Sequence, residues 1–303
     1  MKFCDKIIKK TSAEGFLCVN FSLADTEQGR DDLNHQFIPV DCHMHSTLSP
    51  DGCDTPEVMA KRACELGIQH FTLTDHIENE KLDSWDYHGA MEKSYEVYLK
   101  LKEEYAGRMN VYYGAELGQP LYDLPQAEAI LEKYDYDFVL GSQHRTRSYA
   151  RVDKLPDSEE VRYRYMDEYF EELLALAEWG RFCSLSHLTF PLRFISGDIG
   201  GHQVDMSRYS AIIDKILDVI ISKDIAMEVN SSGIRKGLHV SMPSAEYVQR
   251  YYDKGGRMIT IGSDAHRAAD VGADIPECLA ILKKIGYNEI CVFSRRQPTF
   301  IKI

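Results

Sequence analysis

The sequence predicts a single α/β domain that folds as a β/α barrel, and three observations lead to this prediction. Short apolar runs alternate about seven or eight times with longer segments of helical periodicity, which is typical of a parallel sheet. The 303 residues are 44% hydrophobic and 27% charged, which is enough apolar material to bury one large core. The composition stays uniform from residue 37 onward, and this favours a closed or nearly closed barrel over a doubly wound sheet.

The elements follow one another in a regular order. Residues 1–36 are polar and weakly periodic, so we expect an N-terminal extension with little structure, followed by the barrel over residues 37–303. Strands are expected over residues 37–42, 69–74, 110–115, 137–141, 182–186, 225–229, 258–261 and 289–293. Helices are expected over residues 55–67, 94–105, 158–179, 207–222 and 244–252. The first helix begins with Thr55 as its N-cap and Pro56 at its first position, and it ends at Gly67.

Charge and cysteine content narrow the class of function. The chain has 35 Lys and Arg against 48 Asp and Glu, a formal net charge of -13, which argues against binding nucleic acid or an anionic membrane through a basic surface. No apolar run reaches the roughly 18 residues of a membrane span, and the N-terminus lacks the apolar core of a secretory signal. The eight cysteines are scattered without a C-x-x-C pair, so we expect reduced thiols in a cytoplasmic protein.

Polar residues follow the predicted strands at the positions where a β/α barrel carries its chemistry. The motifs after the first seven strands are, in order, H-x-H-x-x-x-S-x-D-G from His43, T-D-H from Thr74, G-A-E ending at Glu116, G-S-Q-H ending at His144, S-H ending at His187, E-V-N from Glu228 and G-S-D-A-H ending at His266. A single histidine after a strand is usually an ordinary loop residue, and we interpret His35, His70, His88, His202 and His239 in this way. The set needs another explanation, because imidazoles and carboxylates that converge on one barrel mouth require cations.

The spacing of these residues indicates a metal cluster. His43 and His45 point to the same side of an extended strand end and can share one metal, whereas Asp264 and His266, in a turn, could serve one metal or two. Mixed imidazole and carboxylate ligands favour Zn, Mn or Fe over Mg or Ca. Nine candidates exceed one tetrahedral site and predict two to three divalent transition metals with a bridging carboxylate. The nine are His43, His45, Asp51, His76, Glu116, His144, His187, Asp264 and His266.

Together these motifs resemble the polymerase and histidinol phosphatase (PHP) superfamily, and within it the histidinol-phosphate phosphatases, over about residues 37–293. The resemblance implies a single distorted (β/α)7 TIM-like barrel, so that residues 289–293 or another short run would lie outside the barrel. It also implies a site with three metals. His43, His45, Glu116 and Asp264 would bind the first metal, and Glu116 would bridge to a second metal held by His144 and His187. Asp51, His76 and His266 would bind the third metal. Asp51 stands where some members have His, and all nine positions are filled.

The resemblance also implies an activity, the hydrolysis of L-histidinol phosphate to L-histidinol and phosphate in histidine biosynthesis, by a hydroxide that bridges two metals. The catalytic residues are then expected to be Glu116, Asp264 and His266. Arg193 and Arg235 resemble the family's phosphate-clamping arginines, because a guanidinium matches two phosphate oxygens. Three further expectations concern neighbours of the site. Arg145 and Arg267 are weaker phosphate candidates, and Asp75 either orients His76 or caps a helix. Residues 85–88 form a loop, which is expected to be an ordinary packed loop, with a cover over the site as the alternative.

Three other functions stay open at this point. A PHP-type phosphoesterase for nucleotides or oligonucleotides would use the same chemistry, although the acidic balance and the missing basic, aromatic groove count against a polynucleotide. An amidohydrolase-type metallohydrolase would have a lysine bridge where Glu116 is expected here. A metal-stabilised module without catalysis is the third. The expected partner is a small phosphorylated substrate, and the sequence is compatible with a monomer or a small homo-oligomer.

Overall fold

The protein is described by a computed structural model that covers residues 39–79 and 85–303. The predicted extension over residues 1–36, and His35 with it, lies outside the described residues. The main sheet is parallel with the strand order β1-β2-β4-β5-β6-β7-β8. These strands are β1 (Val40–Asp41), β2 (His70–Leu73), β4 (Asn110–Gly118), β5 (Phe138–Ser142), β6 (Ser184–Leu185), β7 (Ala226–Asn230) and β8 (Ile259–Gly262).

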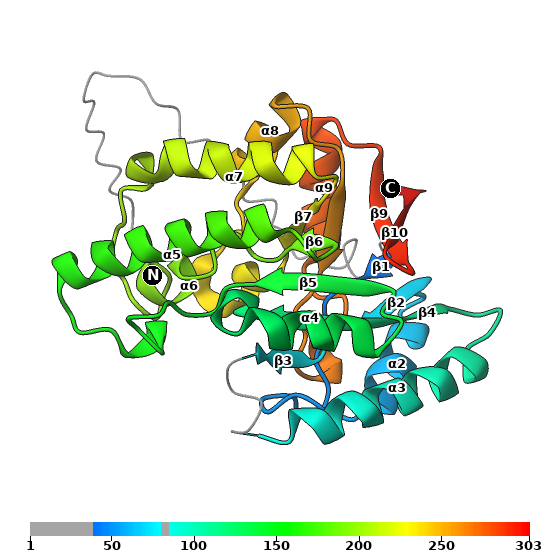
Figure 1. Cartoon of the computed structure of the whole chain (residues 1–303). Coiled ribbons are helices and arrows are strands. Elements are labelled where there is room, and N and C mark those ends of the chain that lie inside the picture. Colours follow the sequence, from blue (N-terminus) through cyan, green and yellow to red (C-terminus); the bar gives the residue numbers. More distant parts are fainter. Residues whose placement is uncertain (1–38, 80–84) are drawn as a thin grey trace, which may run out of the picture. The chain divides into compact units, whose positions relative to one another are not determined.

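Backbone hydrogen bonds join the first strand to the last and nearly close the barrel. The Cys42 amide donates to the Ile261 carbonyl at 3.0 Å, and the Asp264 amide donates to the His43 carbonyl at 2.8 Å. Each residue of β5, β7 and β8 is buried, as expected for parallel strands covered on both faces. The predicted α/β barrel with seven parallel strands is therefore confirmed (Figure 1).

One barrel strand is split into two. β2 pairs with the first half of β4, with His70 opposite Asn110, and the short strand β3 (His76–Glu78) pairs with its second half, with His76 opposite Glu116. The interruption falls at Thr74 and Asp75, between the two pairings. The second pairing places the T-D-H histidine directly beside the carboxylate of Glu116 at the mouth of the barrel.

The eighth predicted strand is not part of the barrel. Residues 289–293 belong to β9 (Glu289–Ser294), which pairs antiparallel with β10 (Gln297–Lys302) in a separate two-stranded sheet. The turn between them places Arg295 and Arg296 at φ 50° and 59°, a conformation that favours Gly and Asn in tight hairpins. Because two arginines occupy this turn, the sequence carries no hairpin signal there. The strand itself was predicted, and its place outside the barrel is one that the family resemblance implied.

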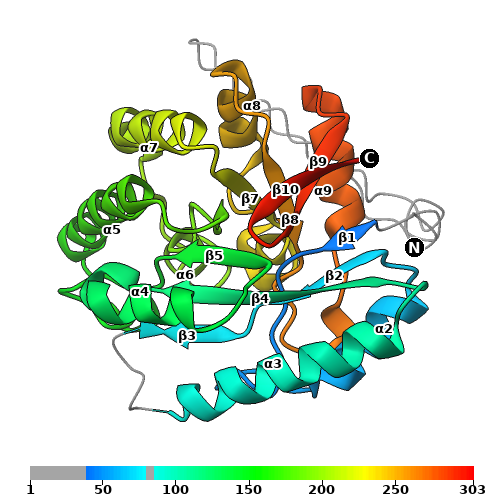
Figure 2. The ribbon, with the colours of Figure 1, turned by 45° about the vertical axis from the view of Figure 1, so that its right-hand side comes forward.

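Helices lie around the outside of the strands (Figures 1 and 2). They are α2 (Pro56–Glu65), α3 (Tyr87–Glu104), α4 (Leu124–Lys133), α5 (Glu159–Trp179), α6 (Leu192–Ile195), α7 (Ser210–Ser222), α8 (Ala245–Asp253) and α9 (Ile275–Ile285), with short helical turns η2 (Pro120–Tyr122), η3 (Val152–Lys154), η4 (Met206–Tyr209), η5 (Ile234–Leu238) and η6 (Ala268–Asp270). The signals that end the predicted helices behave as expected for α5, because Ser158 accepts a hydrogen bond from the Val161 amide and Gly180 adopts φ 66°. None of the helices in the described part of the chain is long and apolar enough to cross a membrane.

Two helix predictions need correction. α4 and α9 were not expected, although proline lies in the first turn of each, the position that suits helix starts. α3 begins at Tyr87 and not at residue 94, because the Asp86 carboxylate accepts a hydrogen bond from the Gly89 amide and caps the helix. The segment 85–88, expected as a loop, thus contains a helix start.

Candidate metal centre

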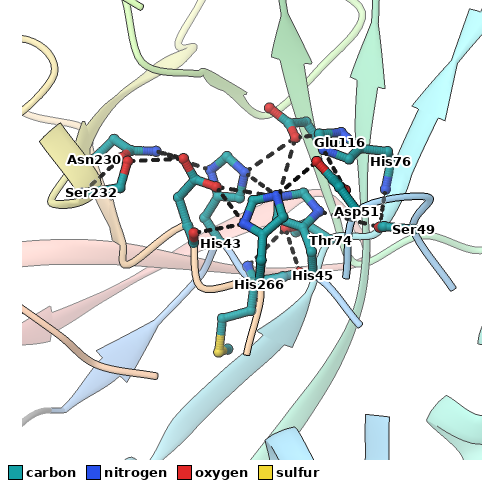
Figure 3. Close-up of polar contacts among 12 residues, drawn as sticks. His43, His45, Ser49, Asp51, Thr74, His76, Glu116, Asn230, Ser232 and His266 are labelled. Atoms are coloured by element: carbon teal, nitrogen blue, oxygen red, sulfur yellow. Dashed lines mark hydrogen bonds and ion pairs between the residues drawn. The ribbon is translucent and has the colours of Figure 1, made fainter. Parts of the chain in front are cut away.

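The C-terminal ends of the parallel strands bring all nine predicted ligands to one mouth of the barrel. Figure 3 shows six of them, His43, His45, Asp51, His76, Glu116 and His266. Four groups among the described residues have ligand atoms within 4.8 Å of one another: His43, His45 and Asp264; Glu116, His144 and His187; His45, His76 and His266; and, as the fourth, His76, Glu78 and His144. Asp51 joins the third group, because its carboxylate oxygens lie 3.6 Å from His76 Nε2 and 3.2 Å from His266 Nε2. The first three groups overlap the three sets that the family resemblance implies, and the fourth adds Glu78, which was not among the predicted ligands.

Glu116 lies at the centre of this arrangement and is only 1% exposed. Its Oε1 is 3.0 Å from His144 Nε2 and 2.9 Å from His187 Nε2. Its Oε2 is 3.3 Å from His43 Nε2 and 2.9 Å from His76 Nδ1. Although Oε2 is buried among imidazole nitrogens, no hydrogen bond of suitable geometry reaches it. A carboxylate with one oxygen toward each histidine set is the donor arrangement that suits a bridge between two divalent cations.

The donor set itself fits transition metals. Among the nine residues, six offer imidazole nitrogen and three offer carboxylate oxygen, a mixture that suits Zn, Mn or Fe. His76 Nδ1 is also buried without a hydrogen-bond partner of suitable geometry. Buried polar atoms without partners are rare in native proteins, and among imidazoles and carboxylates they fit the donors of a metal ion.

The local backbone explains how the first and last strands place their ligands. A side chain on Gly262 would put its Cβ 2.2 Å from the Cβ of His43, so only glycine allows β8 to approach the first strand this closely. Asp264, two residues later, has φ 51°, a left-handed conformation that Asp tolerates better than most residues. Non-glycine residues in this conformation cluster at functional sites, although hairpin turns such as the one at Arg295 and Arg296 also contain them.

Asp75 has a different role from either one expected. Its carboxylate accepts hydrogen bonds from the Ser46 amide at 2.7 Å and from Ser49 Oγ at 2.7 Å. Ser49 Oγ in turn accepts a hydrogen bond from the backbone amide of His76 at 2.9 Å. Asp75 therefore fixes the loop after the first strand, and it reaches His76 through Ser49 and not by a direct bond to the ring.

Histidines and carboxylates in the cluster shift one another's pKa values, because their opposite charges attract. Burial lowers the pKa of His43, but the Glu228 and Glu116 carboxylates outweigh it and hold that pKa well above its ordinary value. Burial likewise opposes the charge on His144, yet Glu116 and Glu78 raise its pKa to about 9. Burial raises the pKa of Glu116, but His43 and His144 hold it well below the usual range. Glu116 is therefore ionised at neutral pH. Its charge must be balanced by protonated histidines or by bound metal ions next to it.

The two predicted phosphate arginines are placed differently. Arg193, in α6, lies 5.0 and 4.6 Å from the ring centres of Phe190 and Phe194, and its Nη1 is 3.7 Å from Asp264 Oδ2. That Nη1 is buried without a hydrogen-bond partner. Arg193 also lines a cavity of about 500 Å³ at the barrel mouth, together with ligands such as Glu116 and His266.

Arg235, in η5, makes other contacts. Its Nη2 donates to the carbonyls of Ser263 and Asp264, and its Nη1 lies 3.4 Å from the Asp274 carboxylate. Among the described residues that line the cavity, Arg235 is not included. Its guanidinium supports the backbone around Asp264 in this conformation.

The two weaker phosphate candidates also pair with carboxylates. Arg145 Nη2 lies 3.4 Å from Glu78 Oε2. The exposed Arg267 pairs with Asp270 at 2.9 Å.

Three residues near the cluster were not assigned from the sequence. Glu78 Oε1 lies 2.7 Å from His144 Nδ1, Glu228 Oε1 lies 2.6 Å from His43 Nδ1, and Lys236 Nζ lies 3.8 Å from Asp264 Oδ2. The strand-end position of Glu228 was a usable signal, whereas Glu78 follows the T-D-H motif in a strand too short to recognise.

The histidines interpreted as ordinary have other surroundings. His70 Nδ1 lies 2.9 Å from the Tyr112 hydroxyl, and His239 Nε2 lies 3.0 Å from Asp198. His202 Nε2 lies 3.4 Å from Asp157, and His88 is exposed on α3.

Comparison with known proteins places these features in a family. A family model described as PHP domain matches residues 41–232. A probable histidinol-phosphatase of Thermotoga maritima is 31% identical over 265 residues, 86% of this chain and 98% of the relative. A probable histidinol-phosphatase of Clostridium acetobutylicum is 26% identical over 253 residues, 82% of this chain and 95% of the relative. The crystal structure of histidinol phosphate phosphatase from Lactococcus lactis, complexed with Zn, L-histidinol and phosphate, has a TM-score of 0.69 at 20% identity and covers 86% of this chain and 98% of its own, which shows a shared fold.

Proposed function

Because the chain belongs to the PHP domain family, we propose that it is a phosphoesterase that hydrolyses L-histidinol phosphate to L-histidinol and phosphate. The observation that carries the proposal is Glu116, whose two oxygens face two separate histidine sets at the mouth of a barrel. Two relatives at 26–31% identity are named probable histidinol-phosphatases, which supports L-histidinol phosphate as the substrate. The L-histidinol and phosphate bound in the Lactococcus lactis structure support the same substrate.

The residues of the cluster would hold two to three divalent metals. The first set is His43, His45, Glu116 and Asp264, the second is Glu116, His144 and His187, and the third is Asp51, His76 and His266. Bound metals of this kind neutralise phosphate charge and supply an activated water near neutral pH. Glu116, Asp264 and His266 are proposed as the catalytic residues, because Glu116 connects the sets and Asp264 Oδ1 lies 3.4 Å from His266 Nδ1.

The substrate phosphate would bind beside Arg193. Its buried Nη1 has no hydrogen-bond partner, so a phosphate oxygen would satisfy it. The rings of Phe190 and Phe194 hold the guanidinium in place and exclude water on that side. Arg235 is proposed as the second phosphate contact, and it would have to exchange its bonds to the backbone carbonyls for bonds to the phosphate. A cavity of about 500 Å³ suits a small phosphate ester.

A phosphate-release screen tests the substrate. The purified protein, supplied with Zn, Mn or Fe, is assayed against L-histidinol phosphate, AMP, other small phosphate esters and a short single-stranded oligonucleotide with a 3′-phosphate. The highest kcat/KM is expected for L-histidinol phosphate. A higher value for AMP or the oligonucleotide would favour a nucleotide phosphoesterase, and turnover of none of them with metals bound would favour the metal-stabilised module.

A pair of variants ties the activity to the site. H187A removes an imidazole that faces Glu116, and we expect it to abolish most activity. H70A removes an imidazole that contacts the Tyr112 hydroxyl, and we expect it to keep the activity. Equal activity in both variants would refute the proposed site. The expected cytoplasmic location and the state as a monomer or small homo-oligomer stay predictions.

A further inference from the structure

Two buried carboxylates contact the cluster from opposite sides in the same way. Glu228, on β7, is 1% exposed, and its Oε1 lies 2.6 Å from His43 Nδ1. Glu78, on β3, has 13% of its side chain exposed, and its Oε1 lies 2.7 Å from His144 Nδ1. In both histidines the other ring nitrogen, Nε2, is directed toward Glu116, at 3.3 Å for His43 and 3.0 Å for His144.

The chemistry of imidazole gives this arrangement a consequence. A neutral imidazole binds a cation only through the nitrogen that carries no proton, and the proton then stays on the other nitrogen. A carboxylate accepts a hydrogen bond but cannot donate one when ionised. A carboxylate at Nδ1 therefore keeps the proton there, leaves the Nε2 lone pair free and fixes the rotation of the ring.

We propose that Glu78 and Glu228 are the positioning residues of the metal centre, each holding the proton on Nδ1 of one histidine so that Nε2 faces the cation beside Glu116. This inference rests on the metal part of the proposed function, and it does not depend on the substrate. Glu228 serves the set with His45 and Asp264, and Glu78 serves the set with His187. Glu78 Oε1 also lies 3.9 Å from His76 Nδ1, so its position would allow it to bind a cation with His76 and His144 as well, and the experiment below must separate the two roles.

Each carboxylate is itself held by hydrogen bonds to its second oxygen. Glu228 Oε2 accepts a hydrogen bond from the backbone amide of His187 at 2.7 Å, and Asn230 Nδ2 donates to the same oxygen at 3.3 Å. Glu228 thereby links a ring of the first set to the backbone of the second, and it fixes the spacing of the two sets.

Glu78 is held through its other oxygen, because Arg145 Nη2 donates to Oε2 at 3.4 Å. Arg145 therefore neutralises a positioning carboxylate, a role that differs from the phosphate contact for which it was a weaker candidate in the sequence. The two carboxylates have no contact with each other's histidine among the bonds described, so each can be altered separately.

Metal affinity is the first measurement. The variants E228Q and E78Q keep the shape of the side chain, but an amide can present either a donor or an acceptor to Nδ1 and no longer fixes the tautomer. After chelator treatment, Zn²⁺ is titrated against a competing chromophoric chelator. Each variant should lose about 10- to 100-fold in affinity at one set, the usual effect of removing such a partner. E172Q is the matched control, because Glu172 accepts a hydrogen bond from the Tyr122 hydroxyl and its contacts include none of the nine ligands.

Histidine NMR separates positioning from a general loss of structure. In the Zn-loaded protein labelled with ¹⁵N-histidine, His43 and His144 should each show a low-field Nδ1 proton that exchanges slowly with solvent. E228Q should remove the His43 signal and E78Q the His144 signal, while E172Q keeps both. Both measurements are independent of phosphate release, so the positioning role can hold even if L-histidinol phosphate is not the substrate.

Three results would overturn the proposal. Unchanged Zn²⁺ affinity in both variants would show that the carboxylates are incidental neighbours. Persistence of both Nδ1 proton signals in the variants would show that the tautomer is fixed by other groups. Loss of one whole equivalent of Zn²⁺ at saturation in E78Q, with the His144 signal retained, would make Glu78 a metal ligand and not a positioning residue.

Discussion

The placement of Arg193 leads to a prediction about phosphate binding that can be worked out in some detail. Its side chain is 14% exposed, its Nη1 has no hydrogen-bond partner, and it faces the cavity that contains the cluster. In the free enzyme the guanidinium therefore has few hydrogen bonds to give up when phosphate arrives. A charge-assisted hydrogen bond contributes roughly 1.5–3 kcal/mol, which corresponds to a fall in kcat/KM of about 10- to 150-fold for R193A.

The variant series is designed to separate this contact from other effects of the substitution. R193K keeps a positive charge without the planar fork, so it should recover part of the loss. R208A is the matched control, because Arg208 also stacks on an aromatic ring, 4.2 Å from the centre of Tyr163, and lies 4.0 Å from the Asp167 carboxylate. Metal content should stay at the wild-type level in all three variants, since Arg193 is not among the predicted ligands.

The assay is phosphate release under kcat/KM conditions with L-histidinol phosphate and with a second small ester. The fold-loss in R193A should be similar for both, because the contact is made to the group that they share. Wild-type kcat/KM in R193A, or a loss no larger than that of R208A, would refute the phosphate role and turn attention to Arg235 and Lys236.

Three further predictions concern the cluster and its frame. E116Q should lower both bound metal and kcat by orders of magnitude, because both carboxylate oxygens face histidine sets; near-normal turnover would exclude the bridge. Elemental analysis of protein prepared without chelator should give two to three equivalents of Zn, Mn or Fe, and chelator treatment should remove activity and lower the Tm; one equivalent or less with full activity would contradict a cluster. G262A should weaken metal binding and lower the Tm, since its new Cβ would lie 2.2 Å from the Cβ of His43; an unchanged Tm and metal content would show that β8 can shift without cost.

The sequence predicted the barrel from the alternation of strands and helices. It predicted the clustering of the nine ligands from their positions directly after the strands. Parallel strands appear as short apolar runs between helical segments, and polar residues that follow them must lie at one mouth. The pairing of β3 with β4 could not be predicted in the same way, since three residues show no alternation that can be recognised. Glu78, which sits in this short strand, was missed for that reason.

Arginine positions were harder to predict than ligand positions. Arg193 and Arg235 have similar places after successive strands, yet one faces the cavity and the other bonds to the carbonyls of Ser263 and Asp264. The difference arises in η5, where Lys236 and Gly237 leave helical geometry and turn the chain beside Asp264. A long flexible side chain on such a turn has no direction that a sequence pattern can specify.

Charge balance in the cluster bears on the number of metals. Besides Asp51, Glu116 and Asp264, the site contains the carboxylates of Glu78 and Glu228. Two cationic side chains offset part of this negative charge, because Arg145 pairs with Glu78 and Lys236 Nζ lies 3.8 Å from Asp264 Oδ2. Unbalanced charge in a buried site is costly, so metal occupancy should follow the charge that the protein groups leave. Three negative charges remain, and two divalent ions together with Arg193 turn them into an excess of two positive charges, which matches a phosphate dianion. The charge of the site therefore requires at least two ions when phosphate is bound, and substrate affinity should fall when metal occupancy falls below two.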